Sequence, residues 1–187
     1  MTISLPISDL IGLRSAQATL ARATGFLGRG LSASAMLPIV GPHRCKVIGN
    51  SLRELDRFLS LLIDEIARLI LPGDVSADFG RQRNTPNKLR AIRAAMALPS
   101  PDHARLRAIG RSRDCLFHTG GVVRRGDLRG DMMMTVGWMR PDTAHAARIS
   151  QGEFLSVDAE EIAELCCFYD AVVGDLLDAF ADFRRAD

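Results

Sequence analysis

The chain has 187 residues, of which 47% are apolar and 25% are charged, so it is long enough for one sizeable core and short for two domains. Aromatic residues make up 5% of the sequence, which argues against RNA-binding modules that stack successive bases on aromatic side chains. The four cysteines lack CxxC spacing and indicate reduced thiols. No secretory leader and no apolar run of about 18 residues is visible, so we expect a cytoplasmic protein that does not span a membrane.

The basic residues are unevenly distributed along the chain. Residues 81–129 contain 12 Lys and Arg against three Asp and no Glu, a net charge of +9, and the remainder must carry −7 to give the total of +2. A basic segment of this kind suits a polyanion such as RNA or DNA. The alternative is a solvated basic face that pairs with the acidic C-terminal helix of the same chain.

The first part of the chain predicts two helices. Apolar residues at helical spacing follow Ser8, a plausible N-cap, and stop at the glycines of residues 28–30. A connecting loop rich in Gly, Ser, Ala and Pro comes next. Ser51 and Glu54 have the spacing of a capping box, and a strongly amphipathic helix follows them until a Pro-Gly pair. An earlier start at Cys45 fits the same pattern.

Two shorter helices are predicted next, each with proline at its start. A Thr-Pro pair at residues 85–86 opens the first, and a Ser-Pro pair at residues 100–101 opens the second. The second of these helices covers residues 101–118 and ends at a Gly-Gly pair, where a glycine C-cap is expected.

The period of the pattern then changes from helical to extended. Residues 132–139 and 148–157 read as short strands, which predicts a small β-hairpin insert over about residues 132–157. Asp158 and Glu161 form another capping pair, and the final helix continues from there to Arg184. Its apolar residues form one continuous stripe, and its other face is strongly acidic.

Five helices with a small hairpin before the last one predict an all-α fold, an antiparallel helical bundle, and we expect residues 1–187 to form one domain. The sequence lacks the motifs of P-loop hydrolases, dinucleotide-binding enzymes, zinc proteases and α/β-hydrolases. Its four histidines have no ligand-like spacing, so we predict neither a metal site nor a cofactor.

The segment that closes the fourth predicted helix carries one motif. Arg113, the adjacent Asp114 and His118 are followed by Thr-Gly-Gly-Val-Val. Here the sequence resembles the HEPN superfamily of helical ribonucleases and nucleotide-associated proteins, whose motif is an Arg, a polar residue and a His a few residues further on. Asp114 stands where Asn is the commoner family choice. Arg140 and His145 repeat the spacing, but the intervening proline argues against a helix there.

Helical geometry separates the members of this motif. At about 100° per residue, Arg113 and His118 lie about 140° apart, whereas Arg107, Arg111, Asp114 and His118 share one face. Arg113 instead falls on the apolar stripe of the helix. An unpaired charge buried there costs several kcal/mol, so its guanidinium must reach a partner.

The sequence supports two interpretations of Arg113. In the structural interpretation it pairs with a carboxylate of the terminal helix, such as Asp175 or Asp178, and holds the bundle together. In the functional interpretation its side chain turns towards His118 in a cleft. Arg111, in line with His118, is the substitute if Arg113 proves structural.

The resemblance implies roles for the motif. In a HEPN-type endoribonuclease His118 is the general acid and base, Arg113 stabilises the phosphate, and Asp114 either orients one of them or, as a carboxylate, depresses activity. Such a reaction needs no metal, because imidazole exchanges protons near neutral pH and guanidinium is a permanent forked donor to phosphate. The alternative for His118 is a histidine stabilised by the C-terminal end of the helix dipole.

The resemblance also implies partners. We expect RNA to contact Arg107, Arg111, Arg124 and Arg125, and we expect a homodimer whose active cleft lies at the two-fold interface. The family suggests a toxin or antiviral defence effector, with a possible cognate antitoxin. The alternatives are a non-catalytic HEPN-like protein that binds RNA, a nucleotide or a protein, and a helical adaptor whose acidic and basic surfaces pair between protomers.

Overall fold

Five helices and one two-stranded sheet make up the part of the chain that the structure, a computed structural model, describes: residues 7–30, 43–71, 73, 79, 81–82, 84–138 and 147–186. The helices are α1 (Ile7–Gly30), α2 (Arg44–Ile70), α4 (Thr85–Ala95), α5 (His103–Thr119) and α6 (Ala159–Ala186). The strands are β1 (Met133–Thr135) and β2 (Arg148–Ser150). The predicted all-α bundle with a small hairpin before the last helix is confirmed.

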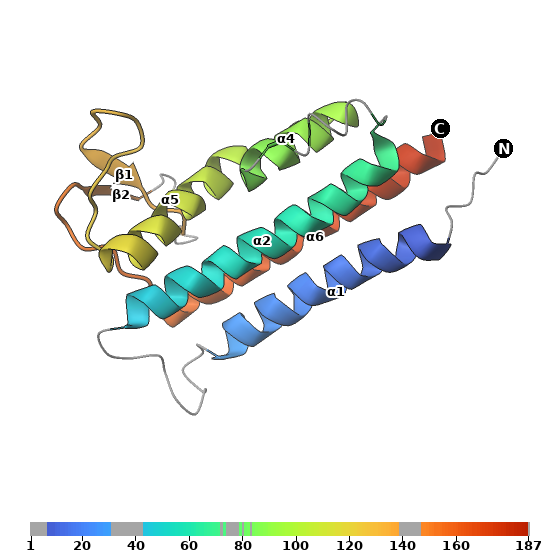
Figure 1. The fold of residues 1–187 in the computed structure, drawn as a ribbon. Coiled ribbons are helices and arrows are strands. Elements are labelled where there is room, and N and C mark those ends of the chain that lie inside the picture. Colours follow the sequence, from blue (N-terminus) through green and yellow to red (C-terminus); the bar gives the residue numbers. More distant parts are fainter. Residues whose placement is uncertain are drawn as a thin grey trace.

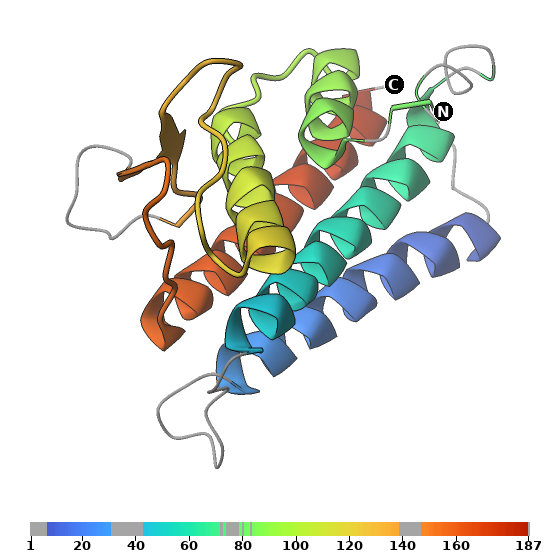
Figure 2. The ribbon, with the colours of Figure 1, turned by 60° about the vertical axis from the view of Figure 1, so that its left-hand side comes forward.

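The bundle has four rows of helix. α2 and α6 run in the same direction, and α1 packs against both of them in the opposite direction (Figure 1). α4 and α5 follow one another along the other side of α2 and run antiparallel to it, so together they take the place of one long helix. The hairpin lies beside the C-terminal half of α5 (Figure 2). The end of α5 is therefore enclosed by α2 on one side and by the hairpin on the other.

The amphipathic pattern of α2 places this helix at the centre of the core. The fully buried side chains of α2 recur at helical spacing: Ile48, Leu52, Leu55, Leu59, Leu62, Ile63 and Ile66. The earlier start at Cys45 is correct to within one residue, because α2 begins at Arg44. The predicted capping box is wrong, since Ser51 lies inside the helix, where its hydroxyl donates to the Val47 carbonyl at 3.0 Å. Ser8 likewise lies within α1 and not at its N-cap.

Local cap chemistry sets the start of α4 and the end of α5, but the predicted start of α5 at the Ser-Pro pair of residues 100–101 is wrong, because α5 begins at His103 after Asp102, whose side chain makes no capping hydrogen bond. Asn84 caps α4, since its side-chain oxygen accepts from the Asn87 N–H at 3.4 Å. The Thr-Pro pair predicted the N-cap one residue later, at Thr85. The Thr85 hydroxyl instead donates to the Asp56 carboxylate of α2 at 3.1 Å. α5 ends as predicted at a glycine C-cap, Gly120, with φ of 61°.

The hairpin is antiparallel and shorter than the predicted strands. Met134 lies opposite Ile149, and both strands contain three residues. The segment after β1 docks on α5 through a buried hydrogen bond in which the Gly137 N–H donates to Ser112 Oγ at 3.0 Å. Residues 139–146, with the second Arg-His pair of the sequence, lie outside the described residues.

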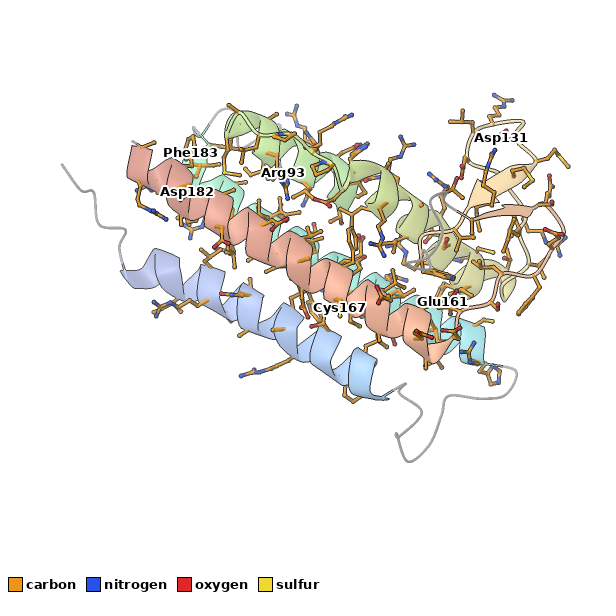
Figure 3. All side chains as sticks on the ribbon, turned by 180° about the vertical axis from the view of Figure 1, so that it is seen from behind. Arg93, Asp131, Glu161, Cys167, Asp182 and Phe183 are labelled. Carbon is orange, nitrogen blue, oxygen red and sulfur yellow. The ribbon has the colours of Figure 1, made fainter. Side chains whose placement is uncertain are left out.

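α6 begins at the capping box that the sequence predicts. The Glu161 N–H donates to Asp158 Oδ1 and the Asp158 N–H donates to Glu161 Oε2, each at 2.8 Å. Figure 3 shows Glu161 at this end of α6, Asp182 and Phe183 at the opposite end, and Cys167 between them. The predicted apolar stripe is buried in the core at Ile162, Leu165, Cys166, Tyr169, Val172, Val173, Leu176 and Phe180.

Candidate nucleic-acid interface

The position of the motif is set by close packing between α2 and α5. Gly49 of α2 faces α5 so closely that a Cβ added there would lie 2.9 Å from the Phe117 nitrogen and 3.1 Å from the Arg113 carbonyl oxygen. A side chain at this position would force the two helices apart. The backbone contact therefore fixes the last two turns of α5, including His118, against α2.

Arg113 lies on the α2 side of α5 and is fully engaged by carboxylates. Its guanidinium contacts Asp56 of α2 at 3.0 Å and its neighbour Asp114 at 2.9 Å. The Arg113 and Asp56 side chains are only 18% and 22% exposed. Asp56 also accepts from Thr85 of α4 at 3.1 Å, so this one carboxylate joins three helices.

The electrostatics of the pair follow from its burial. Burial raises the pKa of Asp56, although the Arg113 guanidinium and the Thr85 hydroxyl act to lower it. Burial acts to lower the pKa of Arg113, but the adjacent Asp56 and Asp114 carboxylates more than offset this, so that pKa lies above its usual value. A buried cation and a buried anion of this kind depend on one another.

This geometry corrects the predicted partners of Arg113. The carboxylate comes from Asp56 of α2 and not from Asp175 or Asp178 of the terminal helix. Among the described side chains, the polar contacts of Arg113 are with Asp56 and Asp114, and none is with His118. The structural interpretation correctly predicted that Arg113 pairs with a carboxylate of another helix, but it named the wrong carboxylates.

Within the described residues, the basic segment also pairs mainly with carboxylates other than those of α6. Lys88, which is buried, contacts Asp64 of α2 at 2.7 Å, and Arg93 contacts Asp102 at 3.2 Å. Arg105 is the exception, since Glu164 of α6 attracts its charge and its guanidinium lies 4.2 Å from the centre of the Phe168 ring. The paired cations therefore stabilise the fold, and the remaining arginines must be considered separately.

The opposite side of α5 opens into a cavity of about 580 Å³. Five of the predicted site residues line it: Arg111, Asp114, His118, Arg124 and Arg125. Of the four residues predicted to share one helical face, Arg111, Asp114 and His118 line this cavity and Arg107 does not. The segment that follows the glycine C-cap carries Arg124 and Arg125, and both residues line the same cavity.

The cations around this cavity differ in how firmly they are held. Arg111 forms an ion pair with Asp127 of the hairpin segment at 2.9 Å. Arg124 and Arg125 are exposed, and neither forms an ion pair or hydrogen bond within the described part of the chain. His118 is also exposed, and its ring contacts only the edge of Phe117 among the described rings. The cavity thus offers two arginines and an imidazole to an incoming anion.

Asp127 fixes Arg111 through the hairpin. Its carboxylate accepts from the Thr135 N–H at 2.8 Å and from the Thr135 hydroxyl. Burial acts to raise the pKa of Asp127, but these two hydrogen bonds and the charges of Arg111 and Arg148 outweigh it and lower that pKa. Asp127 therefore favours its charged form and holds Arg111, which lines the cavity, while Asp127 itself borders the neighbouring cavity.

Arg107 lies apart from the other predicted RNA-binding residues. It is exposed and lines a neighbouring cavity of about 440 Å³, together with Arg111, Arg113 and Asp114. α5 thus separates two cavities, and Arg111 and Asp114 border both of them. Of the four predicted RNA-binding residues, Arg111, Arg124 and Arg125 line one cavity, and Arg107 lines the neighbouring one, which Arg111 also borders.

Sequence reasoning missed two cations on the other side of the motif. Lys46 and Arg53 of α2 lie over the Phe117 ring, with Nζ and Cζ at 5.8 Å and 5.7 Å from its centre. Both precede the basic segment, and no sequence pattern links them to it. A signal was present in their spacing, because residues seven apart share a helix face.

The arrangement can bind a phosphate and exchange a proton beside it. Arginines supply forked donors to phosphate oxygens, and a solvent-accessible imidazole can act as acid or base. Within the described ranges, no group of three His, Cys, Asp or Glu side chains is arranged to hold a metal ion.

Comparison with models of known protein families, with curated proteins and with solved structures gives no match. In the described part of the chain, no helix combines the length and the apolar character needed to cross a membrane. Conclusions about function therefore rest on the geometry of the cavity and on the resemblance in the motif.

Proposed function

We propose that this protein is a HEPN-type endoribonuclease that binds RNA in the cavity between α5 and the hairpin and cleaves it with His118. The observation that carries the proposal is the shared lining of this cavity by His118, Arg111, Arg124 and Arg125. Unpaired arginines attract a polyanion without reading its sequence. An imidazole beside them is the group that phosphodiester cleavage requires.

The chemistry needs a base, an acid and a phosphate ligand. Neutral imidazole of His118 takes the proton from the ribose 2′-hydroxyl, whose oxygen attacks the adjacent phosphorus. The bond from phosphorus to the 5′-oxygen breaks, and an imidazolium returns a proton to that leaving oxygen. The products are a 2′,3′-cyclic phosphate and a 5′-hydroxyl, and the arginines stabilise the charge on phosphorus during the step.

In this proposal the phosphate ligand differs from the one implied by the motif. Arg113 is held by Asp56 and Asp114, whereas Arg111, Arg124 and Arg125 line the cavity with His118. We assign phosphate binding to Arg124 and Arg125, which have no ion pair in the described part of the chain, and supporting roles to Arg111, which Asp127 holds, and to Arg113. A homodimer that joined two cavities would supply a second His118, so that one imidazole acts as base and the other as acid. A toxin or defence role, with an antitoxin, belongs to the same proposal.

The test is incubation of purified protein with end-labelled RNA in EDTA. We expect cleavage with 2′,3′-cyclic phosphate ends, and we expect His118→Ala to reduce the rate by about 10²- to 10⁴-fold, the range for loss of a general acid or base. His103→Ala is the matched control, because this histidine also lies on α5 but contacts Asn87 and not the cavity. Intact RNA with folded wild-type protein, or equal loss in both variants, contradicts catalysis by His118.

One observation favours a second function, RNA binding without cleavage. The arginine of the motif is committed to Asp56 and Asp114, and without it the site has fewer groups positioned at the reacting phosphate. In that case the wild-type protein binds RNA with strong salt dependence, leaves it intact, and loses affinity in Arg124→Gln/Arg125→Gln.

A further inference from the structure

The last turn of α5 is flanked by cations on both sides. On the hairpin side lie Arg124 and Arg125 in the cavity. On the α2 side, Lys46 and Arg53 lie over the ring of Phe117. The same ring contacts the imidazole of His118 edge-on, with ring centres 4.9 Å apart and planes at 87°. His118 therefore lies between two basic groups that come from different parts of the chain.

The charges of Lys46 and Arg53 are not neutralised. Both side chains are exposed, and within the described part of the chain their contacts are with the Phe117 ring and not with a carboxylate. The nearest acidic residue along the helix, Glu54, instead contacts Arg57 at 3.7 Å. An aromatic ring positions a cation without cancelling its charge, so this contact leaves both groups able to bind an anion.

We propose that Lys46 and Arg53 form a second phosphate-binding subsite, so that a single-stranded RNA passes over His118 from the cavity to α2. This inference rests on the proposed function and adds the course of the substrate. Phe117 already carries two cations, so it is not free to stack a base, and the contacts on this side are with phosphates. A single strand fits because it can bend at the phosphate beside His118, whereas a duplex holds a regular A-form backbone.

The test is the affinity of Lys46→Gln/Arg53→Gln for a fluorescent single-stranded RNA over a range of salt concentrations, in the His118→Ala background to prevent cleavage. We expect roughly tenfold weaker binding at low salt and a salt slope smaller by about 1.4, since each phosphate contact on a single strand contributes about 0.7. Arg14→Gln/Arg22→Gln is the matched control. It removes the same charge from exposed positions on α1, which packs on a different side of α2 from α5.

Further variants keep the result interpretable. Lys46→Arg/Arg53→Lys preserves both charges and is expected to bind as the parent does, with thermal unfolding measured for every variant. Parent-like affinity and slope in the neutral variant, or the same change in the α1 control, overturns the subsite. If Arg124→Gln/Arg125→Gln weakens binding while the α2 variant does not, the proposed function stands and this inference fails. Absence of RNA binding in the parent overturns both.

Competitors test the class of ligand. Unlabelled single strand should displace the probe at lower concentration than a duplex of the same length. Equal competition by the duplex contradicts the single-stranded substrate. Stronger competition by polyglutamate, with the same dependence on Lys46 and Arg53, would indicate an acidic protein partner and would also overturn the proposal.

Discussion

Arginines lie on both sides of α5, but their exposure and their ion pairing differ between the two sides. On the α2 side Arg113 is largely buried and contacts two carboxylates, whereas on the hairpin side Arg124 and Arg125 are exposed and have no carboxylate partner in the described structure. Arg111 is intermediate, since it lines the cavity and is held by Asp127. The ion pairing of an arginine, and not its place in a sequence motif, therefore distinguishes a cation that stabilises the fold from one that is available to a ligand.

The greatest loss of stability is expected from the removal of Arg113, on the α2 side of α5. Arg113→Met leaves Asp56 without its cation in a buried position, and we expect the free energy of unfolding to fall by about 3 kcal/mol, as for other broken buried pairs. Chemical denaturation measures this. Arg107→Met, an exposed arginine of the same helix, should change stability by less than about 0.5 kcal/mol. Full stability with lost RNA cleavage in Arg113→Met would instead make Arg113 part of the site.

The ion pair between Arg111 and Asp127, the intermediate case, is tested through the pH dependence of the free energy of unfolding. Asp127→Ala removes two acceptors of Thr135 and the partner of Arg111, and we expect a loss of about 2 kcal/mol at neutral pH. Because the pKa of Asp127 in the folded state lies below the ordinary value of 3.8, the stabilisation is present above that value and is lost as the pH falls through the folded pKa. The difference between wild type and variant should therefore shrink below about pH 4.

A nearby carboxylate provides the control for this pH dependence. Asp131 contacts Arg148 at 3.8 Å, and both side chains are at least 40% exposed, so Asp131→Ala should alter stability by at most a few tenths of a kcal/mol. Unfolding curves at neutral and acidic pH make the comparison. A difference for Asp127→Ala that persists unchanged at pH 2 to 3 would contradict the assigned role of its charge.

The smallest change in stability and in RNA affinity is expected for Asp114, which lies between the Arg113 side of α5 and the cavity. Asp114 contacts Arg113 but is 57% exposed and borders the cavity. Asp114→Asn introduces the residue that is commoner in the HEPN pattern, keeps an acceptor for Arg113 and removes a negative charge beside the proposed RNA path. We expect a change in stability below about 0.5 kcal/mol and about twofold tighter RNA binding. Asp114→Glu should bind as wild type does, and weaker binding by Asp114→Asn would refute the expected repulsion.

Much of the fold could be predicted because local chemistry and tertiary structure agree. The capping pair of Asp158 and Glu161 and the glycine C-cap at Gly120 were found from sequence and are present. The capping box at Ser51 was wrong because apolar burial continues upstream, at Ile48, and extends the helix past a local start signal. A helix therefore extends past a local capping pattern when its apolar face stays buried on both sides of that pattern.

The candidate site could be predicted only along α5. Helical periodicity brought Arg111, Asp114 and His118 to one face, and they line one cavity. The partner of Arg113 could not be found this way, because Asp56 is 57 residues distant in sequence and its approach depends on how α2 packs on α5. The same packing brings Lys46 and Arg53 to Phe117.

The contact at Gly49 has a consequence for which polymers the surface can recognise. Because Gly49 leaves no room for a side chain between α2 and α5, close packing fixes the main chain that carries Lys46 and Arg53 relative to the main chain that carries Phe117 and His118. If the proposed RNA path is right, this fixed separation favours a ligand whose phosphates recur at a matching spacing. A ligand whose negative charges recur at that interval matches it without any reading of sequence, and one with a different interval engages only one end.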